Sequence, residues 1–194
     1  MSPYSRAVTA KTHAPELFRE AVAALQSVEP RPEVRLEAIR PPQRLAPWSY
    51  ALSGEATGPA EVMATGRLVL LHDPEGPESW NGVLRLVVYV RAELDRELAT
   101  DPFLPGVSWS WLTDALETSG ASWTALGGTV TETSSARFGD IAGPPRSDDL
   151  EVRASWTPVD AELRPHGDAF CQLLSSVVGL PPAGVTLFGQ RQSS

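Results

Sequence analysis

The sequence predicts an α+β domain, with a mostly antiparallel sheet of about six strands and three helices packed on one face. Three segments repeat apolar residues at helical spacing, and six others alternate or concentrate apolar residues as strands do. Several strand segments are joined by links too short for a crossover, so they must be antiparallel neighbours. Helices with one apolar stripe can cover such a sheet and bury both apolar surfaces.

The first helix is expected directly after Pro15, with Thr12 or His13 as its candidate cap. Pro30 and Pro32 follow its last turn and end it. Its apolar residues recur at helical spacing, giving about three turns: Leu17, Phe18, Ala21, Val22 and Leu25.

The next segments read as four strands and a loop. Alternation predicts short strands over 33–38 and 48–52, whereas the composition of 53–60 predicts a loop. Two stronger strands follow, Met63–His72 and Val83–Leu94, joined by a turn that contains proline and glycine. The second of these is apolar on both faces, which favours a central place in the sheet.

A second helix is predicted over 107–118, closed by Gly120 as its C-terminal cap. Two more strands are expected over 121–133 and 149–157. The glycine pair at 127–128 predicts a bulge or sharp bend in the first of them.

The last helix is predicted over 168–178. We therefore expect a single domain over residues 15–182, a flexible N-terminal segment over 1–14 and a short polar C-terminal tail over 183–194. No internal repeat suggests a second domain.

Composition and charge favour a cytosolic protein. Hydrophobic residues make up 42% of the 194 residues and charged residues 21%, which is typical of a globular domain. A net charge of -8 disfavours general binding to nucleic acid or to an anionic membrane. Cys171 is the only cysteine, and we identify neither a signal peptide nor an apolar run of ~20 residues. We expect a cytoplasmic location.

Seven stretches of the sequence resemble one known family, the actinobacterial domain of unknown function 3000. The stretches are PQRLAP at 42–47, ATGRLVLLHDP at 64–74, WNG at 80–82, RLV at 85–87, VRAEL at 90–94, WSWL at 109–112 and RASWTP at 153–158. The resemblance spans roughly 15–182. It implies no activity and no catalytic residue, although it implies genes that often lie near a ribonuclease D-like gene.

The sequence contains few residues suited to catalysis. His72-Asp73 is the best acid/base pair because it ends a strand and enters a loop, but a strand end followed by a turn explains it more simply. His13 and His166 are expected in mobile or loop segments, and Cys171 lies among apolar residues as a buried, inert thiol. We expect no metal and no cofactor, because neither ligand spacing nor a phosphate-binding loop occurs.

Six tryptophans are more than a domain of this size usually carries. Trp109 and Trp111 lie two residues apart on a helix and point in different directions, so one could line a pocket or a partner surface. Core packing is the simpler interpretation of all six.

The sheet face away from the helices is expected to carry Arg35, Arg85, Tyr89, Arg91 and Arg153. Arginines with a tyrosine can grip an acidic partner or stack bases. Because glutamates alternate on the same face, cross-strand ion pairs explain the pattern more simply.

Three functions follow from these observations. The first is a non-enzymatic binding or regulatory module that acts through a protein partner on the arginine face. The second is a small-molecule binder or enzyme with a pocket between helices and sheet, walled by Trp109 or Trp111 with His72-Asp73 near the mouth. The third is an RNA-associated accessory protein, although its negative charge makes nucleic acid an unfavourable partner.

Overall fold

The computed structural model describes residues 14–141, 143 and 146–182. The helices are α1 (Glu16–Gln26), α2 (Leu104–Thr118) and α3 (Arg164–Val177), with short 3-10 turns η1 (Pro59–Glu61), η2 (Glu78–Trp80) and η3 (Leu98–Thr100). The strands are β1 (Val34–Ile39), β2 (Trp48–Thr57), β3 (Met63–His72), β4 (Leu84–Leu94), β5 (Trp123–Ala136) and β6 (Arg146–Pro158).

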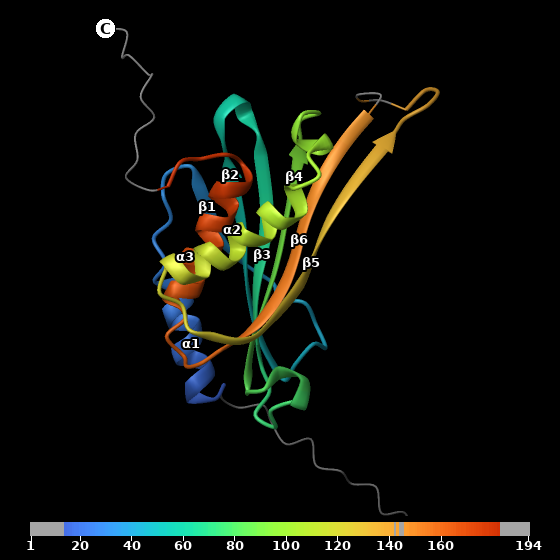
Figure 1. Ribbon diagram of the computed structural model, residues 1–194. Coiled ribbons are helices and arrows are strands. Elements are labelled where there is room, and N and C mark those ends of the chain that lie inside the picture. Colours follow the sequence, from blue (N-terminus) through green and yellow to red (C-terminus); the bar gives the residue numbers. More distant parts are fainter. Residues whose placement is uncertain (1–13, 142, 144–145, 183–194) are drawn as a thin grey trace, which may run out of the picture.

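The strands form a six-stranded sheet in the order β1-β2-β3-β4-β6-β5, with every neighbouring pair antiparallel. The three helices lie together on one face of this sheet (Figure 1). The predicted fold class is therefore confirmed, and β4 occupies the central position that its two apolar faces predict. None of the helices in the described part of the chain is long and apolar enough to cross a membrane.

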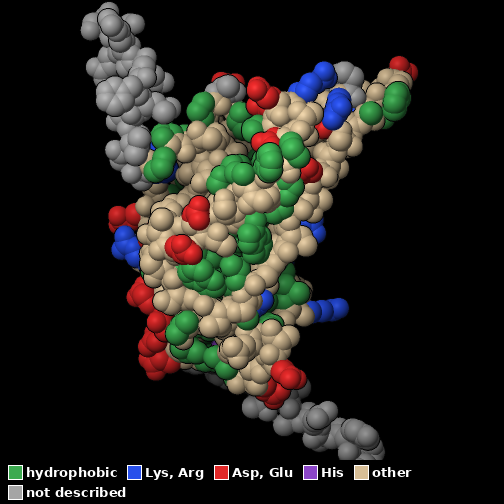
Figure 2. All heavy atoms as spheres, viewed as in Figure 1, with side chains coloured by type: hydrophobic (Ala, Val, Ile, Leu, Met, Phe, Trp, Pro, Cys, Tyr) green, Lys and Arg blue, Asp and Glu red, His purple; other side chains and the backbone are tan. Residues whose placement is uncertain are grey.

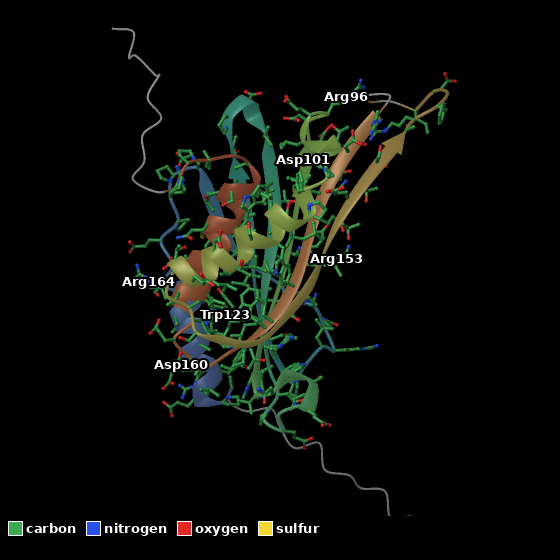
Figure 3. The ribbon with its side chains drawn as sticks, in the orientation of Figure 1. Arg96, Asp101, Trp123, Arg153, Asp160 and Arg164 are labelled. Carbon is green, nitrogen blue, oxygen red and sulfur yellow. The ribbon has the colours of Figure 1, made fainter. Side chains whose placement is uncertain are left out.

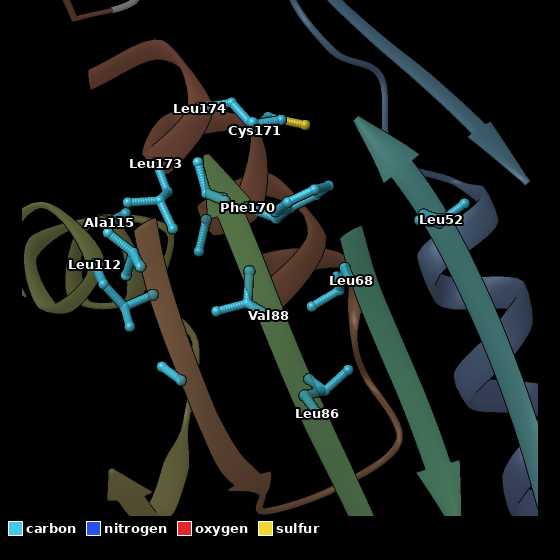
Figure 4. Packing of buried hydrophobic residues seen from close by; sticks show 14 of the residues in the cluster. Leu52, Leu68, Leu86, Val88, Leu112, Ala115, Phe170, Cys171, Leu173 and Leu174 are labelled. Atoms are coloured by element: carbon cyan, nitrogen blue, oxygen red, sulfur yellow. The ribbon is translucent and has the colours of Figure 1, made fainter. Parts of the chain in front are cut away.

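The main core fills the space between the helices and the sheet. Alternate residues of β4 and β6 point into it, as the sequence predicts: Leu84, Leu86, Val88, Val90, Leu150, Val152, Ala154 and Trp156. From the helix side, Phe170 and Leu174 of α3 and Leu112 of α2 join the same core (Figure 4). Burial of this apolar surface is the main force that holds the two layers together.

Strand β2 is longer than the sequence predicts, because residues 53–57 are strand and not loop. A Cβ atom on Gly54 would come within 2.5 Å of Leu174 Cδ1 and 2.8 Å of Phe170 Cε1. Glycine is therefore needed for α3 to approach the sheet, and the local composition that reads as a loop serves packing instead.

Two helices begin earlier than predicted. Helix α2 begins at Leu104 and helix α3 at Arg164, each with a proline within its first two residues. Proline is compatible with the first turn because the N–H groups there have no partner within the helix. As a consequence, His166 lies in a helix with an exposed fraction of 2%, and its predicted place in a mobile or loop segment is wrong.

A second, small apolar cluster lies on the other face of the sheet. It consists of Ala51, Val69 and Leu71, with Trp80 and Val87 among the residues packed against them. On the face away from the helices, which we call the open face, a small apolar cluster on β2 and β3 thus lies beside polar residues of β4 and β6.

Candidate functional site

His72 and Asp73 are held by contacts within the fold. The His72 ring is buried, its Nδ1 atom lies 2.9 Å from the carbonyl oxygen of Val83, and it stacks on Phe18 at 6.1 Å between ring centres. An Asp73 carboxylate oxygen accepts the backbone N–H of Glu75 at 3.0 Å, which closes a turn. These contacts fit the structural interpretation, in which the pair ends a strand and starts a turn.

His166 and Cys171 are buried in α3. Burial lowers the pKa of His166 to about 4 and raises the pKa of the Cys171 thiol to about 12, so both side chains are uncharged at neutral pH. A thiol in this state is a poor nucleophile. Cys171 lines a groove between α2 and α3, and neither His72 nor His166 lines it.

Arg85 of β4 forms hydrogen bonds with two neighbouring strands of the sheet. Its guanidinium donates to Thr157 Oγ1 and the Ala125 carbonyl at 3.0 Å each, and to both the hydroxyl and the carbonyl of Ser155 at 2.8 and 3.2 Å. The Ala125 carbonyl belongs to the bulge that interrupts β5 between Thr124 and Gly127, next to the predicted glycine pair. Arg85 therefore joins β4, β6 and the bulge of β5.

Tyr89, Arg91 and Arg153 share the open face, but each is engaged with a neighbour. Arg91 pairs with Asp149 at 3.0 Å, and Arg153 pairs with Glu151 at 2.8 Å and lies 5.2 Å from the centre of the Tyr89 ring. The Tyr89 hydroxyl also donates to Glu151. The Arg153 side chain from β6 is marked in Figure 3. The Arg91–Asp149 pair between β4 and β6 and the Arg153–Glu151 pair within β6 thus neutralise much of the positive charge that the sequence places here.

Trp109 and Trp111 are half-buried against the main core. Trp111 also lines the groove between α2 and α3, whereas Trp109 does not. This groove lies between two helices rather than between helices and sheet, and neither His72 nor Asp73 lines it. This groove is therefore not the pocket between helices and sheet that the sequence suggests.

Strand β5 contains none of the site residues that the sequence predicts. It is an edge strand, and among the described residues no strand pairs with its outer side. After the bulge, residues 127–136 pair regularly with β6, and all of them except Val130 are exposed. An exposed edge of this length is a template for a further strand.

The register shows which backbone groups face the outer edge. The N–H of Val159, just after β6, donates to the carbonyl of Ser122, just before β5. Backbone groups alternate in direction along a strand, so the odd-numbered residues of β6 point toward β5. Their partners on β5 are 127, 129, 131 and 133. The N–H and C=O groups of residues 128, 130, 132 and 134 consequently point outward.

The hairpin between β5 and β6 adds apolar surface beside this edge. Phe138 is 81% exposed and Ile141 63% exposed, and both lie in the connection that follows β5. Figure 2 shows apolar side chains at the projecting tip of this hairpin. Exposed aromatic and aliphatic side chains next to an open strand edge are typical of a protein-binding surface.

These observations define the class of protein: an antiparallel sheet with three helices on one face and one long open edge. The chain belongs to the domain of unknown function 3000 family, whose model matches residues 14–186 and is described as a protein of unknown function. The predicted family resemblance is confirmed. Neither a curated protein nor a solved structure matches this chain.

Proposed function

We propose that this protein is a cytosolic, non-enzymatic binding module, and that it recruits an extended segment of a partner protein as an additional strand beside β5. The observation that carries the proposal is the regular, exposed edge over residues 127–136. Main-chain hydrogen bonds to such an edge supply affinity, and neighbouring side chains supply specificity.

The sequence of the edge supports strand addition. Residues 127–136 contain several threonines, which favour strands, and no proline; Glu132 is their one charged residue. Natural proteins usually protect an edge with charges, proline or a covering segment. Here the bulge between Thr124 and Gly127 protects only the beginning of β5.

The positions of the apolar residues favour a partner segment over a second copy of the chain. In a symmetric antiparallel β5–β5 pair, the tip of one hairpin would lie beside the beginning of the other β5 strand. Ala125 lies there with a φ of 51° and interrupts the regular pairing. A separate extended segment can instead follow 127–136 and place apolar side chains against Phe138 and Ile141.

The experiment compares two substitutions at one residue. Glu132→Pro removes an outward N–H and leaves the β6 side of the strand intact, so the fold should persist. Glu132→Ala removes the same side chain but keeps the N–H. A photo-crosslinker at Ser134 would capture the partner from the native host and identify the linked segment. We expect binding of that segment to fall at least tenfold with Glu132→Pro and to change less than threefold with Glu132→Ala.

Amide hydrogen exchange supplies a second measurement. Strand addition should slow exchange at residues 128, 130, 132 and 134 when the captured segment is bound, whereas residues 129, 131 and 133 should change little. Equal binding by both variants, or protection without this alternation, would refute the proposal. A concentration-dependent dimer that Glu132→Pro disrupts would show instead that a second copy occupies the edge.

A further inference from the structure

A groove separate from the β5 edge runs between α2 and α3. Its volume is about 550 Å³, which suits a small organic molecule. One wall comes from α2 and includes Trp111 and Asp114, and the facing wall comes from α3 and includes Asp168 and Gln172. Residues 29–31 and 180–182 also line it. Thr118 Oγ1 donates to Gln172 Oε1 at 2.8 Å and ties the two walls together.

The charge in this groove is unbalanced. Glu29, Asp114 and Asp168 contribute carboxylates, and Arg31 is the one basic residue among the lining residues. Arg31 is already engaged, because it donates to both carboxylate oxygens of Glu33 at 3.0 and 3.2 Å and to the Pro181 carbonyl at 2.7 Å. In Figure 2, acidic side chains stand out on the face that α2 and α3 form. The groove therefore presents net negative charge.

Asp168 is the carboxylate of the groove whose ionised form a bound cation would stabilise most. Burial raises its pKa, and the Arg164 guanidinium opposes this only weakly, at 3.9 Å across an exposed helical turn. A positive group inside the groove would stabilise the ionised carboxylate at short range.

Two further features point to a ligand with both charge and apolar surface. Trp111 offers an indole face, which attracts cations, and Ala115, Cys171 and Leu180 add apolar lining.

We propose that this α2–α3 groove binds a small organic molecule that carries a protonated amine, held by Asp168 and Asp114 against the indole of Trp111. A metal ion fits less well, because no group of three or more His, Cys, Asp or Glu side chains in the described ranges is placed to hold one. The groove also has more room and more apolar surface than an ion requires.

The test uses two amines, phenethylamine and agmatine, and one neutral isostere, phenethyl alcohol. Titrations of the full chain are followed through the indole N–H resonance of Trp111, assigned with Trp111→Phe, and through backbone amides of α2 and α3. We expect saturable shifts at these resonances with at least one amine, and at least tenfold weaker binding of the alcohol. Asp168→Asn should weaken amine binding tenfold or more.

Glu117→Gln is the matched control, since Glu117 lies exposed on α2 and does not line the groove. It should change amine binding less than twofold. Equal weakening by both variants would show only general attraction to an acidic protein and would overturn the proposal. Absence of shifts at millimolar amine, with the thermal midpoint of the protein unchanged, would overturn it as well.

Discussion

The indole N–H of Trp156 donates a hydrogen bond of 3.0 Å to the Nδ1 atom of His166 inside the core. The two rings also stack, with 6.1 Å between their centres. Since Nδ1 accepts this bond, it must be unprotonated, and the structure thus requires a neutral imidazole. Burial acts in the same direction and lowers the pKa of His166 to about 4, while the carboxylate of Asp160 opposes it.

This bond predicts that acid destabilises the protein through His166. Between pH 6.5 and about 4, the unfolded chain protonates this imidazole whereas the folded chain does not. Stability from the neutral ring is therefore complete above pH 6.5 and is lost as the pH falls toward 4. The loss should be on the order of 2–3 kcal/mol. Urea unfolding at a series of pH values measures it.

The matched variant is His166→Gln, whose side-chain oxygen can still accept the Trp156 N–H but cannot titrate in this range. Its free energy of unfolding should fall less than that of the parent between pH 6.5 and 4.5. Parallel pH profiles for the two proteins would contradict the assignment to His166.

Two arginines of the open face, Arg85 and Arg153, should differ in their effect on stability. Arg85 makes four hydrogen bonds across three strands, and Arg85→Ala would leave partly buried oxygens unpaired. We expect a loss of about 2 kcal/mol in the free energy of unfolding. Arg153 is 62% exposed in its pair with Glu151, so Arg153→Ala should cost less than about 1 kcal/mol. Chemical denaturation of both variants tests this order.

The sequence predicts the layers of this fold better than its surfaces, for physical reasons. Alternation in β4 and β6 reports directly which side chains are buried, and both strands follow it. Gly54 lies in a segment whose composition predicts a loop, but this glycine is required by close packing against α3, which no local pattern reports. The free edge of β5 depends on which strand lies last in the sheet, and the sequence fixes that order only through the packing of the whole chain.

The candidate site residues show the same limit. Strand alternation correctly places Tyr89 and Arg153 on the open face, but the pairing of Arg91 with Asp149 depends on the register of β4 with β6. The Trp111 groove could not be predicted, because it requires the angle and distance between α2 and α3. A signal for the β5 edge does exist: residues 127–136 are nearly uncharged and are not strongly apolar on either face.

Gly54 provides a direct test of the contact between α3 and β2. Gly54→Ala would place a methyl group against Leu174 and Phe170, at distances that the present packing does not allow. We expect a loss of about 1–3 kcal/mol in unfolding free energy. Glu55→Ala, at the exposed neighbouring residue, is the control and should change stability by less than about 0.5 kcal/mol. Similar losses of stability in both variants would show that substitution anywhere in this part of β2 is destabilising, and would contradict a specific role for the contact with α3.

The last prediction concerns nucleic acid. Arg91 and Arg153 are paired with Asp149 and Glu151 at 3.0 and 2.8 Å, and the Tyr89 ring lies beside the Arg153 guanidinium. An RNA phosphate would have to replace these carboxylates against a net protein charge of -8. We therefore expect no retention of a labelled single-stranded RNA in filter binding, even at about 50 mM salt. The double variant Asp149→Asn with Glu151→Gln releases both arginines, and it should gain salt-sensitive binding if the carboxylates are what prevents it. Retention by the parent protein that weakens steeply with added salt would instead make the open face a nucleic-acid surface.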